Sequence, residues 1–201
     1  MKIITKIKKS TDKLEVRLMA ARAKTLQLTL AIFKPDIVSH PHIVHQVKNM
    51  IHKSGFLFIR SKRMHLTRAR VQDFYKEHEG RFFYNRLVSF MSSGPISTHI
   101  LARENAIAEW RKLMGPTKVF KTIHDEPESI RGRFGLTDTR NSTHGSDADE
   151  TAKREIHFFF PEFDIEDWYS ECEQRFLSEK VYFDEEHDIH RYISEKEGAQ
   201  S

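Results

Sequence analysis

The sequence is poor in cysteine and tryptophan, with one and two copies in 201 residues. A single cysteine excludes an intramolecular disulfide and a zinc site built from several cysteines, and it favours a reducing compartment. No apolar run approaches the roughly 18 residues of a membrane-spanning helix, which predicts a globular protein with no membrane partner. Because Cys172 stands between Glu171 and Glu173, whose charges disfavour a thiolate, we assign it no catalytic role.

Any large excess of charge is also lacking outside the first 24 residues. The chain has a formal net charge of +4, whereas residues 1–24 alone hold eight Lys or Arg against two acidic residues. The remainder is therefore close to neutral or slightly acidic. This distribution argues against nucleic acid as a partner, although the sequence pI is basic.

Residues 1–24 contain no Pro or Gly and mix Lys with Ile, Leu, Val and Met. A basic, acid-poor and amphipathic N-terminus is typical of a mitochondrial presequence. We therefore expect a mitochondrial matrix location in preference to a cytoplasmic one. The excess of Lys over Arg and the acids Asp12 and Glu15 weigh against this interpretation, and a disordered basic arm is the alternative.

Apolar periodicity divides the following residues into strands and helices. Strand-like apolar runs occur at residues 26–33, 56–66 and 96–102. Helical spacing is found at residues 41–53, 67–77, 82–91 and 146–160, and after Asn105. Thr67 and Asn105 are suitable N-caps. Between residues 115 and 145 the periodicity disappears, which predicts a long loop of the kind that is normally functional in a compact domain.

This alternation of strands and helices predicts an α+β fold. Short connections in the order β-α-β-α-β-α-β favour a ferredoxin-like α/β sandwich, with a four-stranded antiparallel sheet covered by helices. We place this domain at residues 25–177. The charged tail at residues 178–201 is weakly apolar, and its pattern assigns it no structure.

One segment combines a histidine with glycine, small polar residues and nearby arginines. It reads Arg140-Asn141-Ser142-Thr143-His144-Gly145-Ser146-Asp147 and follows Arg131-Gly132-Arg133. Gly145 lets a ligand approach the backbone, and a helix beginning at Ser146 would favour anionic groups. A neutral imidazole is a competent nucleophile toward a phosphoryl group. Most of the 12 histidines are better explained as surface or core residues, and only the neighbours of His144 single it out.

The motif Asn141-x-x-His144-Gly145-Ser146-Asp147 resembles the active-site motif of nucleoside diphosphate kinases, and in particular a divergent group within that family. Further motifs follow in family order, namely Ala31-Ile32-Phe33-Lys34-Pro35-Asp36, Arg81-Phe82-Phe83-Tyr84, Ser93-Gly94-Pro95-Ile96, Leu113-Met114-Gly115-Pro116-Thr117 and Ile130-Arg131-Gly132-x-Phe134. The resemblance covers residues 26–163 and excludes both tails.

The resemblance implies a nucleoside diphosphate kinase with a ping-pong mechanism. His144 would take the terminal phosphoryl group of a nucleoside triphosphate and pass it to a nucleoside diphosphate, with Glu155 orienting the imidazole. Lys34 would contact the terminal phosphate and the ribose, and Tyr75 would lie close to the transferred group. Mg²⁺ would arrive on the nucleotide phosphates, because no carboxylate cluster suggests a dedicated metal site.

The resemblance also implies a set of nucleotide-binding side chains. Arg111, Thr117 and Arg131 would hold the phosphates, whose spread charge suits guanidinium groups and a hydroxyl. Asn141 would hydrogen-bond the sugar, and Phe83 would stack on the base. Stacking tolerates every base, so ATP and other nucleoside di- and triphosphates are the expected partners.

The chain departs from the family pattern between Thr117 and Arg131, where it is a few residues longer than the well-studied hexameric members. That loop borders the nucleotide cleft and a subunit interface in those enzymes, so the extra residues leave the homo-oligomer in doubt. Asp138 adds a negative charge near the expected base pocket. One alternative is a weakly active or partner-dependent subunit that acts mainly as a nucleotide-binding or interaction module. Others are a nucleic-acid-binding or nuclease role for the basic arm and a histidine-directed protein kinase.

Overall fold

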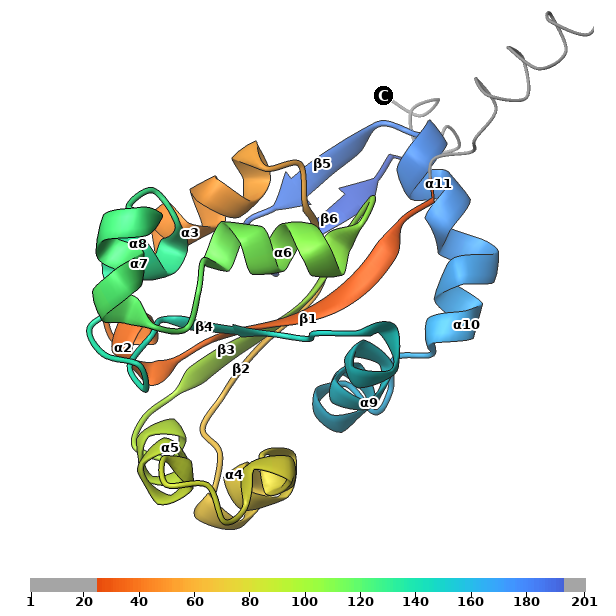
Figure 1. Cartoon of the computed structure of the whole chain (residues 1–201). Coiled ribbons are helices and arrows are strands. Elements are labelled where there is room, and N and C mark those ends of the chain that lie inside the picture. The colour runs from red at the N-terminus through yellow and green to blue at the C-terminus, as the bar shows by residue number, and fades with distance from the viewer. Residues whose placement is uncertain (1–24, 194–201) are drawn as a thin grey trace, which may run out of the picture.

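The computed structural model describes residues 25–193, and Figure 1 shows their arrangement. The predicted presequence or basic arm at residues 1–24 lies outside the described residues. Four strands form the main sheet, namely β1 (Gln27–Phe33), β2 (Leu57–Met64), β3 (Ile96–Arg103) and β4 (Thr143–Gly145). Within residues 25–193, none of the helices combines the length and apolarity that crossing a membrane would require.

The sheet has the order β2-β3-β1-β4, and every neighbouring pair is antiparallel. Strand β1 is therefore central and lies between β3 and β4. This order and the helices on the sheet confirm the predicted ferredoxin-like α/β sandwich.

Helices cover both faces of the sheet (Figure 1). The helices that pack on it are α3 (Pro41–Lys53), α4 (Arg68–Phe74), α5 (Tyr84–Met91), α6 (Ala106–Met114), α8 (Ile130–Phe134) and α9 (Asp149–Phe159). Leu30 and Ile32 of β1 join the core beneath α4, α5 and α9, whereas Ala31 and Phe33 join the core beneath α3, α6 and α8. Burial on both faces explains why β1 is almost continuously apolar.

The predicted helix ends agree with the structure at some positions and differ at others. Thr67 caps α4, since its side chain accepts a hydrogen bond from the backbone of Arg70. Asn105 precedes α6 in a left-handed conformation, with φ at 54°, but its side chain makes no capping hydrogen bond. The helix expected from residue 146 begins at Asp149. Ser146 is therefore not a helix N-terminus, and the expected anion site there is wrong.

The loop predicted at residues 115–145 is wrong in part, because it contains α7 (Val119–Asp125), α8 and β4. Helices of one or two turns are too short to show a clear 3.6-residue period. They are held instead by specific contacts. The Ser129 side chain caps α8 by accepting from the Gly132 backbone, and the Asp138 carboxylate accepts from the Val119 N–H at the start of α7.

The C-terminal segment, for which the sequence pattern assigned no structure, continues as helix and then as a hairpin. Helical segments α10 (Ile165–Asp167), η2 (Trp168–Cys172) and α11 (Glu173–Ser178) lead to β5 (Val181–Asp184) and β6 (Ile189–Tyr192). The hairpin packs on the edge strand β2, where the His190 ring accepts a hydrogen bond from the Phe58 N–H at 2.8 Å. The predicted domain limits, residues 25–177, stay a prediction.

Candidate functional site

The short strand β4 positions His144 beside the centre of the sheet. His144 pairs with Ile32 of β1, so its side chain lies on the face of the sheet that carries α4 and α9. There the imidazole contacts the rings of Phe74 and Tyr75, with centroids 5.4 and 5.9 Å away. Its side chain keeps 20% exposure, so a ligand can reach the ring.

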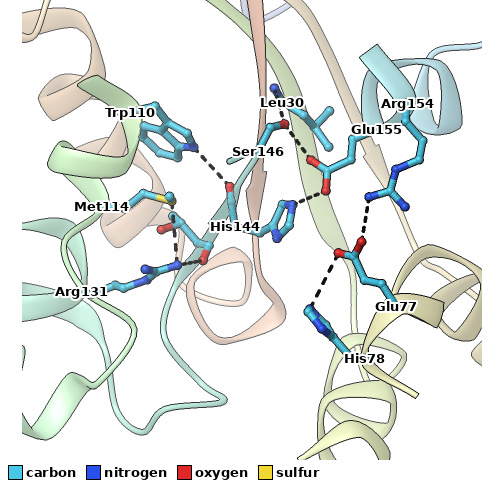
Figure 2. Close-up of polar contacts among 11 residues, drawn as sticks. Leu30, Glu77, His78, Trp110, Met114, Arg131, His144, Ser146, Arg154 and Glu155 are labelled. Atoms are coloured by element: carbon cyan, nitrogen blue, oxygen red, sulfur yellow. Dashed lines mark hydrogen bonds and ion pairs between the residues drawn. The ribbon is translucent and has the colours of Figure 1, made fainter. Parts of the chain in front are cut away.

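A carboxylate and a hydroxyl orient the imidazole (Figure 2). The Nε2 atom of His144 lies 3.0 Å from Oε1 of Glu155, on α9. The other carboxylate oxygen, Oε2, accepts a hydrogen bond from Ser146 Oγ at 2.7 Å. Burial raises the pKa of Glu155, but its interaction with His144, the hydrogen bonds from His144 and Ser146 and the nearby charge of Arg154 together leave that pKa below its ordinary value. Glu155 is therefore an anion that favours a proton on Nε2 of His144.

The backbone around His144 is held by α6. Trp110 donates its indole N–H to the carbonyl oxygen of His144 at 3.2 Å. A Cβ atom at Gly145 would lie 2.4 Å from that indole ring. Only glycine lets Trp110 approach this closely. This contact explains why a glycine follows His144 in the sequence.

Lys34 and Asn141 form a second polar pair near the end of β1. The ammonium nitrogen of Lys34 lies 2.6 Å from Oδ1 of Asn141, and both residues are buried. Burial, reinforced by the nearby charge of Arg131, lowers the pKa of Lys34 to about 7. An anionic ligand beside this ammonium group would favour its charged form.

Arg131 extends from α8 into the same region. Its guanidinium donates to the carbonyl oxygens of Asn141, Gly115 and Thr143 at 3.3, 2.7 and 2.9 Å. Burial and the charge of Arg111 lower the pKa of Arg131 to about 10, so the group stays cationic at neutral pH. Its Nη2 atom also donates to Sδ of Met114 at 3.9 Å. A guanidinium has five N–H donors, so one remains for a ligand.

Two adjoining cavities contain all nine side chains that the sequence singled out. The first, of about 410 Å³, is lined by Lys34, Tyr75, Phe83, Thr117, Arg131, Asn141 and His144. The second, of about 630 Å³, is lined by Arg111, Thr117, Arg131, His144 and Glu155. His144 borders both. Residues from five separated segments of the chain thus converge on one cleft.

Tyr75 has a buried hydroxyl with no hydrogen-bond partner among the described residues. Burial raises the pKa of Tyr75 far above its ordinary value, so the hydroxyl keeps its proton. Asp36 lies two residues after Lys34 and accepts from the Ser142 N–H, while its Oδ1 atom has no partner in the same part of the structure. Buried polar atoms without partners are uncommon and point to a missing ligand or water.

The comparisons with known proteins agree with this geometry. A family model described as nucleoside diphosphate kinase matches residues 27–165. The chain belongs to the nucleoside diphosphate kinase family. It is 54% identical over 172 residues to nucleoside diphosphate kinase 6 of Xenopus tropicalis, covering 86% of this chain and 96% of that relative. The corresponding Homo sapiens protein is 52% identical over 167 residues, or 83% and 90% of the two chains.

Solved structures of the family show the same fold. The nucleoside diphosphate kinase of Aquifex aeolicus superposes with a TM-score of 0.63 at 36% identity, covering 67% of this chain and 95% of that one. The Encephalitozoon cuniculi enzyme gives a TM-score of 0.62 at 25% identity, with 66% and 88% covered. The resemblance to nucleoside diphosphate kinases, and to the group that includes nucleoside diphosphate kinase 6, is confirmed. Membership supports a nucleotide-binding phosphotransferase of the nucleoside diphosphate kinase kind.

The segment in which the sequence departs from the family pattern carries α7 and borders the cleft. Asp138 does not point freely into the base pocket, because its carboxylate accepts from the Val119 N–H and lies 3.4 Å from the ammonium of Lys118. These contacts hold α7 against the segment that leads to Asn141. The added negative charge is therefore partly neutralised within the loop.

Sequence reasoning missed the part played by two residues that hold His144 and Glu155 in place and by one that lines the cleft. The sequence marks Ser146 only as a motif residue and as an expected helix start, and it gives Trp110 no role, yet these residues hold Glu155 and the His144 backbone. His78 lines both cavities and was not singled out. No local sequence pattern predicts these roles, because each role depends on a contact between segments that are distant in the sequence.

Proposed function

We propose that the protein is a nucleoside diphosphate kinase that works by a ping-pong mechanism through phospho-His144. The observation that carries this proposal is the 3.0 Å contact between Nε2 of His144 and the Glu155 carboxylate at the junction of the two cavities. A proton held on Nε2 by the carboxylate leaves the lone pair on Nδ1, which makes Nδ1 the nucleophile.

In the first half of the cycle, Nδ1 of His144 attacks the terminal phosphorus of a nucleoside triphosphate. A nitrogen–phosphorus bond forms while the bond from phosphorus to the bridging oxygen breaks, and the nucleoside diphosphate leaves with those electrons. The imidazole gains positive charge, which the Glu155 carboxylate stabilises at Nε2. In the second half, a terminal phosphate oxygen of an acceptor diphosphate attacks the same phosphorus. A new oxygen–phosphorus bond forms while the nitrogen–phosphorus bond breaks, and its electrons return to Nδ1, which restores neutral His144.

The remaining side chains would stabilise the negative charge that spreads over the oxygens of the transferred phosphoryl group. Arg131, with its cationic guanidinium, and Arg111 would bind phosphate oxygens, and Thr117 would add a hydroxyl donor. The Tyr75 hydroxyl, protonated and without a partner among the described residues, would donate to the transferred group. Phosphate binding beside Lys34 would favour its ammonium form.

The nucleoside would occupy the cavity that contains Asn141 and Phe83. Asn141 already contacts Lys34 at 2.6 Å, so one pair could hold a ribose hydroxyl and a phosphate together. Phe83 lines the same cavity, and its ring face would accept any base by stacking. This arrangement fits an enzyme that accepts many nucleotides.

We propose that the nucleotides bind as their Mg²⁺ complexes. The described part of the chain contains no group of three His, Cys, Asp or Glu side chains arranged to hold a metal ion, which fits an ion held by the nucleotide phosphates and water. When bound, Mg²⁺ would neutralise charge on the phosphates.

The test is to incubate the purified protein with γ-labelled ATP and then chase with unlabelled GDP. Acid-labile label on the protein, released as labelled GTP, is the expected result. The His144→Ala variant should take up no label, whereas His157→Ala, an exposed histidine on α9, should behave as the native protein. Label that persists in His144→Ala would contradict the assignment of the nucleophile.

A second candidate function is a subunit that needs a protein partner. Phe120, Ile123 and Leu136 are 84%, 44% and 68% exposed around the longer loop. They line a third cavity of about 830 Å³, which shares Arg86, Asp138 and Thr139 with the first. This candidate predicts no label on the isolated chain. Label should appear only after a cell extract is added, and Phe120→Ser should abolish that gain.

The mitochondrial matrix location is likewise proposed, from residues 1–24 alone. A reporter fused to these residues should enter mitochondria, and a diffuse cytosolic signal would refute the proposal.

A further inference from the structure

The C-terminal hairpin, which consists of β5 and β6 (residues 181–192), lines neither cavity of the cleft and has no part in the reaction described above. It packs against β2, the edge strand of the sheet, and lies near α3 (Figure 1). At its turn, the carbonyl oxygen of Asp188 accepts a hydrogen bond from Ser61 Oγ at 2.6 Å, and the Asp188 carboxylate pairs with the Lys48 ammonium group. These contacts anchor the turn of the hairpin.

A hydrogen bond to a histidine ring holds the rest of the hairpin on the strand. The backbone N–H of Phe58, on β2, donates to Nδ1 of His190, on β6, at 2.8 Å. A ring nitrogen accepts a hydrogen bond only while it carries no proton, so this contact requires neutral His190 with its proton on Nε2. In the protonated ring both nitrogens are donors. Two donors would then face each other, and the hydrogen bond to Phe58 would be lost.

A second imidazole makes a positive charge at this position still less favourable. The ring centroid of His52, on α3, lies 5.2 Å from that of His190, and the centroids of Phe58 and Phe183 lie 6.1 and 5.1 Å away. Burial, followed by the charge of His52, lowers the pKa of His190 to about 4. Burial and the charge of Lys48 also lower the pKa of His52. Both rings are therefore neutral near pH 7, where the hairpin is docked.

The other ionisable groups near the hairpin come from the hairpin itself and from α3, β2, β3 and α11. The ion pairs among them are Lys48 with Asp188, Asp184 with His187 and with Arg191, and Arg175 with Glu179. At the turn, a cavity is also lined by His45, Lys62, Arg63 and Glu186. On β3, burial lowers the pKa of His99 to about 3, so this ring stays neutral. Among these described groups, His190 alone bonds the β2 backbone through an atom that a proton would block.

We propose that the C-terminal hairpin is a proton-sensitive latch, which neutral His190 holds on β2 and which uptake of a proton at Nδ1 releases. The docked state accepts only the neutral ring, whereas the ring of a released hairpin would titrate near its ordinary pKa of about 6.5. The ratio of docked to released hairpin is therefore greatest above about pH 6.5 and falls by up to about tenfold for each pH unit below it. Release uncovers the edge of β2, which can then pair with another strand. This inference does not rest on the proposed function.

Hydrogen exchange of the Phe58 amide, followed by NMR, measures the release of the latch, because this amide exchanges when its hydrogen bond opens. Its protection factor, which is corrected for the intrinsic pH dependence of exchange, should fall about thirtyfold between pH 7.5 and 5. His190→Asn presents an acceptor oxygen as many bonds from the backbone as Nδ1, and it does not titrate. In this variant the protection factor should change less than about twofold over the same range.

His187→Asn is the matched control, since His187 is an exposed histidine in the turn of the same hairpin, and it should keep the native dependence on pH. A Phe58 protection factor that does not change with pH in the native protein would overturn the proposal. So would an equal fall in His190→Asn, which would assign the effect to the ion pair of Lys48 and Asp188. The amides of β1, the central strand, should keep their protection, and a parallel fall there would overturn the proposal in favour of global unfolding.

Discussion

Replacing Glu155 by Gln tests the orientation of His144, the proposed nucleophile, with the smallest change in shape. The native carboxylate has two oxygens, and each accepts one hydrogen bond, from His144 Nε2 at 3.0 Å and from Ser146 Oγ at 2.7 Å. A glutamine amide keeps one acceptor oxygen and presents N–H donors in place of the other. One of the two hydrogen bonds must therefore be lost, together with the negative charge that faces His144.

The size of the effect follows from the bond that is lost. A hydrogen bond to a charged group contributes about 1.5–3 kcal/mol, and a barrier change of about 1.4 kcal/mol changes a rate tenfold. We expect the rate of His144 phosphorylation to fall about ten- to a hundredfold in Glu155→Gln. If Ser146 keeps the remaining oxygen, the imidazole also loses its preference for a proton on Nε2.

Single-turnover labelling with γ-labelled ATP measures this rate without interference from product release. Glu150→Gln is the matched control, because Glu150 is an exposed carboxylate in the first turn of the same helix. Thermal unfolding of both variants shows whether the fold is retained. A folded Glu155→Gln variant that labels as fast as the native protein would refute the role given to Glu155.

The remaining predictions concern other parts of the same structure. Gly145→Ala should abolish labelling and cost about 1–3 kcal/mol of stability by overpacking, since its Cβ would lie 2.4 Å from the Trp110 ring; native labelling and melting would contradict this. Because burial lowers the pKa of Lys34 to about 7, its charge is lost as the pH rises through that value, so ADP affinity should fall between about pH 6 and 8, and Lys34→Gln should remove that part of the pH dependence. Deleting residues 181–201 should lower the melting temperature and cause concentration-dependent self-association through the uncovered edge of β2, and unchanged light scattering would count against it. Phe120→Ser should leave the stability of the isolated chain within about 0.5 kcal/mol, as differential scanning calorimetry can check, because Phe120 is 84% exposed.

Much of the fold could be predicted because the long elements repeat their apolar residues over many turns or alternations. Strand β1 and helix α3 show such repeats, and both were located within one or two residues. Helix α8 was missed because it has five residues and its position depends on Arg131, whose buried guanidinium bonds to three carbonyls. A charged residue that is buried by distant backbone partners leaves no apolar pattern in the sequence.

The candidate site could be predicted for a different reason. Its side chains were named through a resemblance that preserves their order along the chain, and the structure brings all of them to one cleft. Ser146 and His78 were missed because their contribution lies in contacts with Glu155 and Tyr75. Such contacts join segments that are distant in sequence, and only the fold makes them neighbours.

Helix α7 shows why the surface beside the cleft could not be inferred from hydropathy. Apolarity alone would bury Phe120 and expose Thr122, whereas the structure exposes Phe120 and buries Thr122 completely. Polar contacts fix the rotation of this helix, since Thr122 Oγ1 donates to the carbonyl oxygens of Pro116 and Lys118 and Asp138 holds the Val119 N–H. The same contacts that anchor the loop at the nucleotide cleft therefore turn an apolar face toward solvent. A protein partner that covered this apolar face would contact α7, which Asp138 holds in place. Any shift of α7 caused by that contact would change the geometry of the cleft.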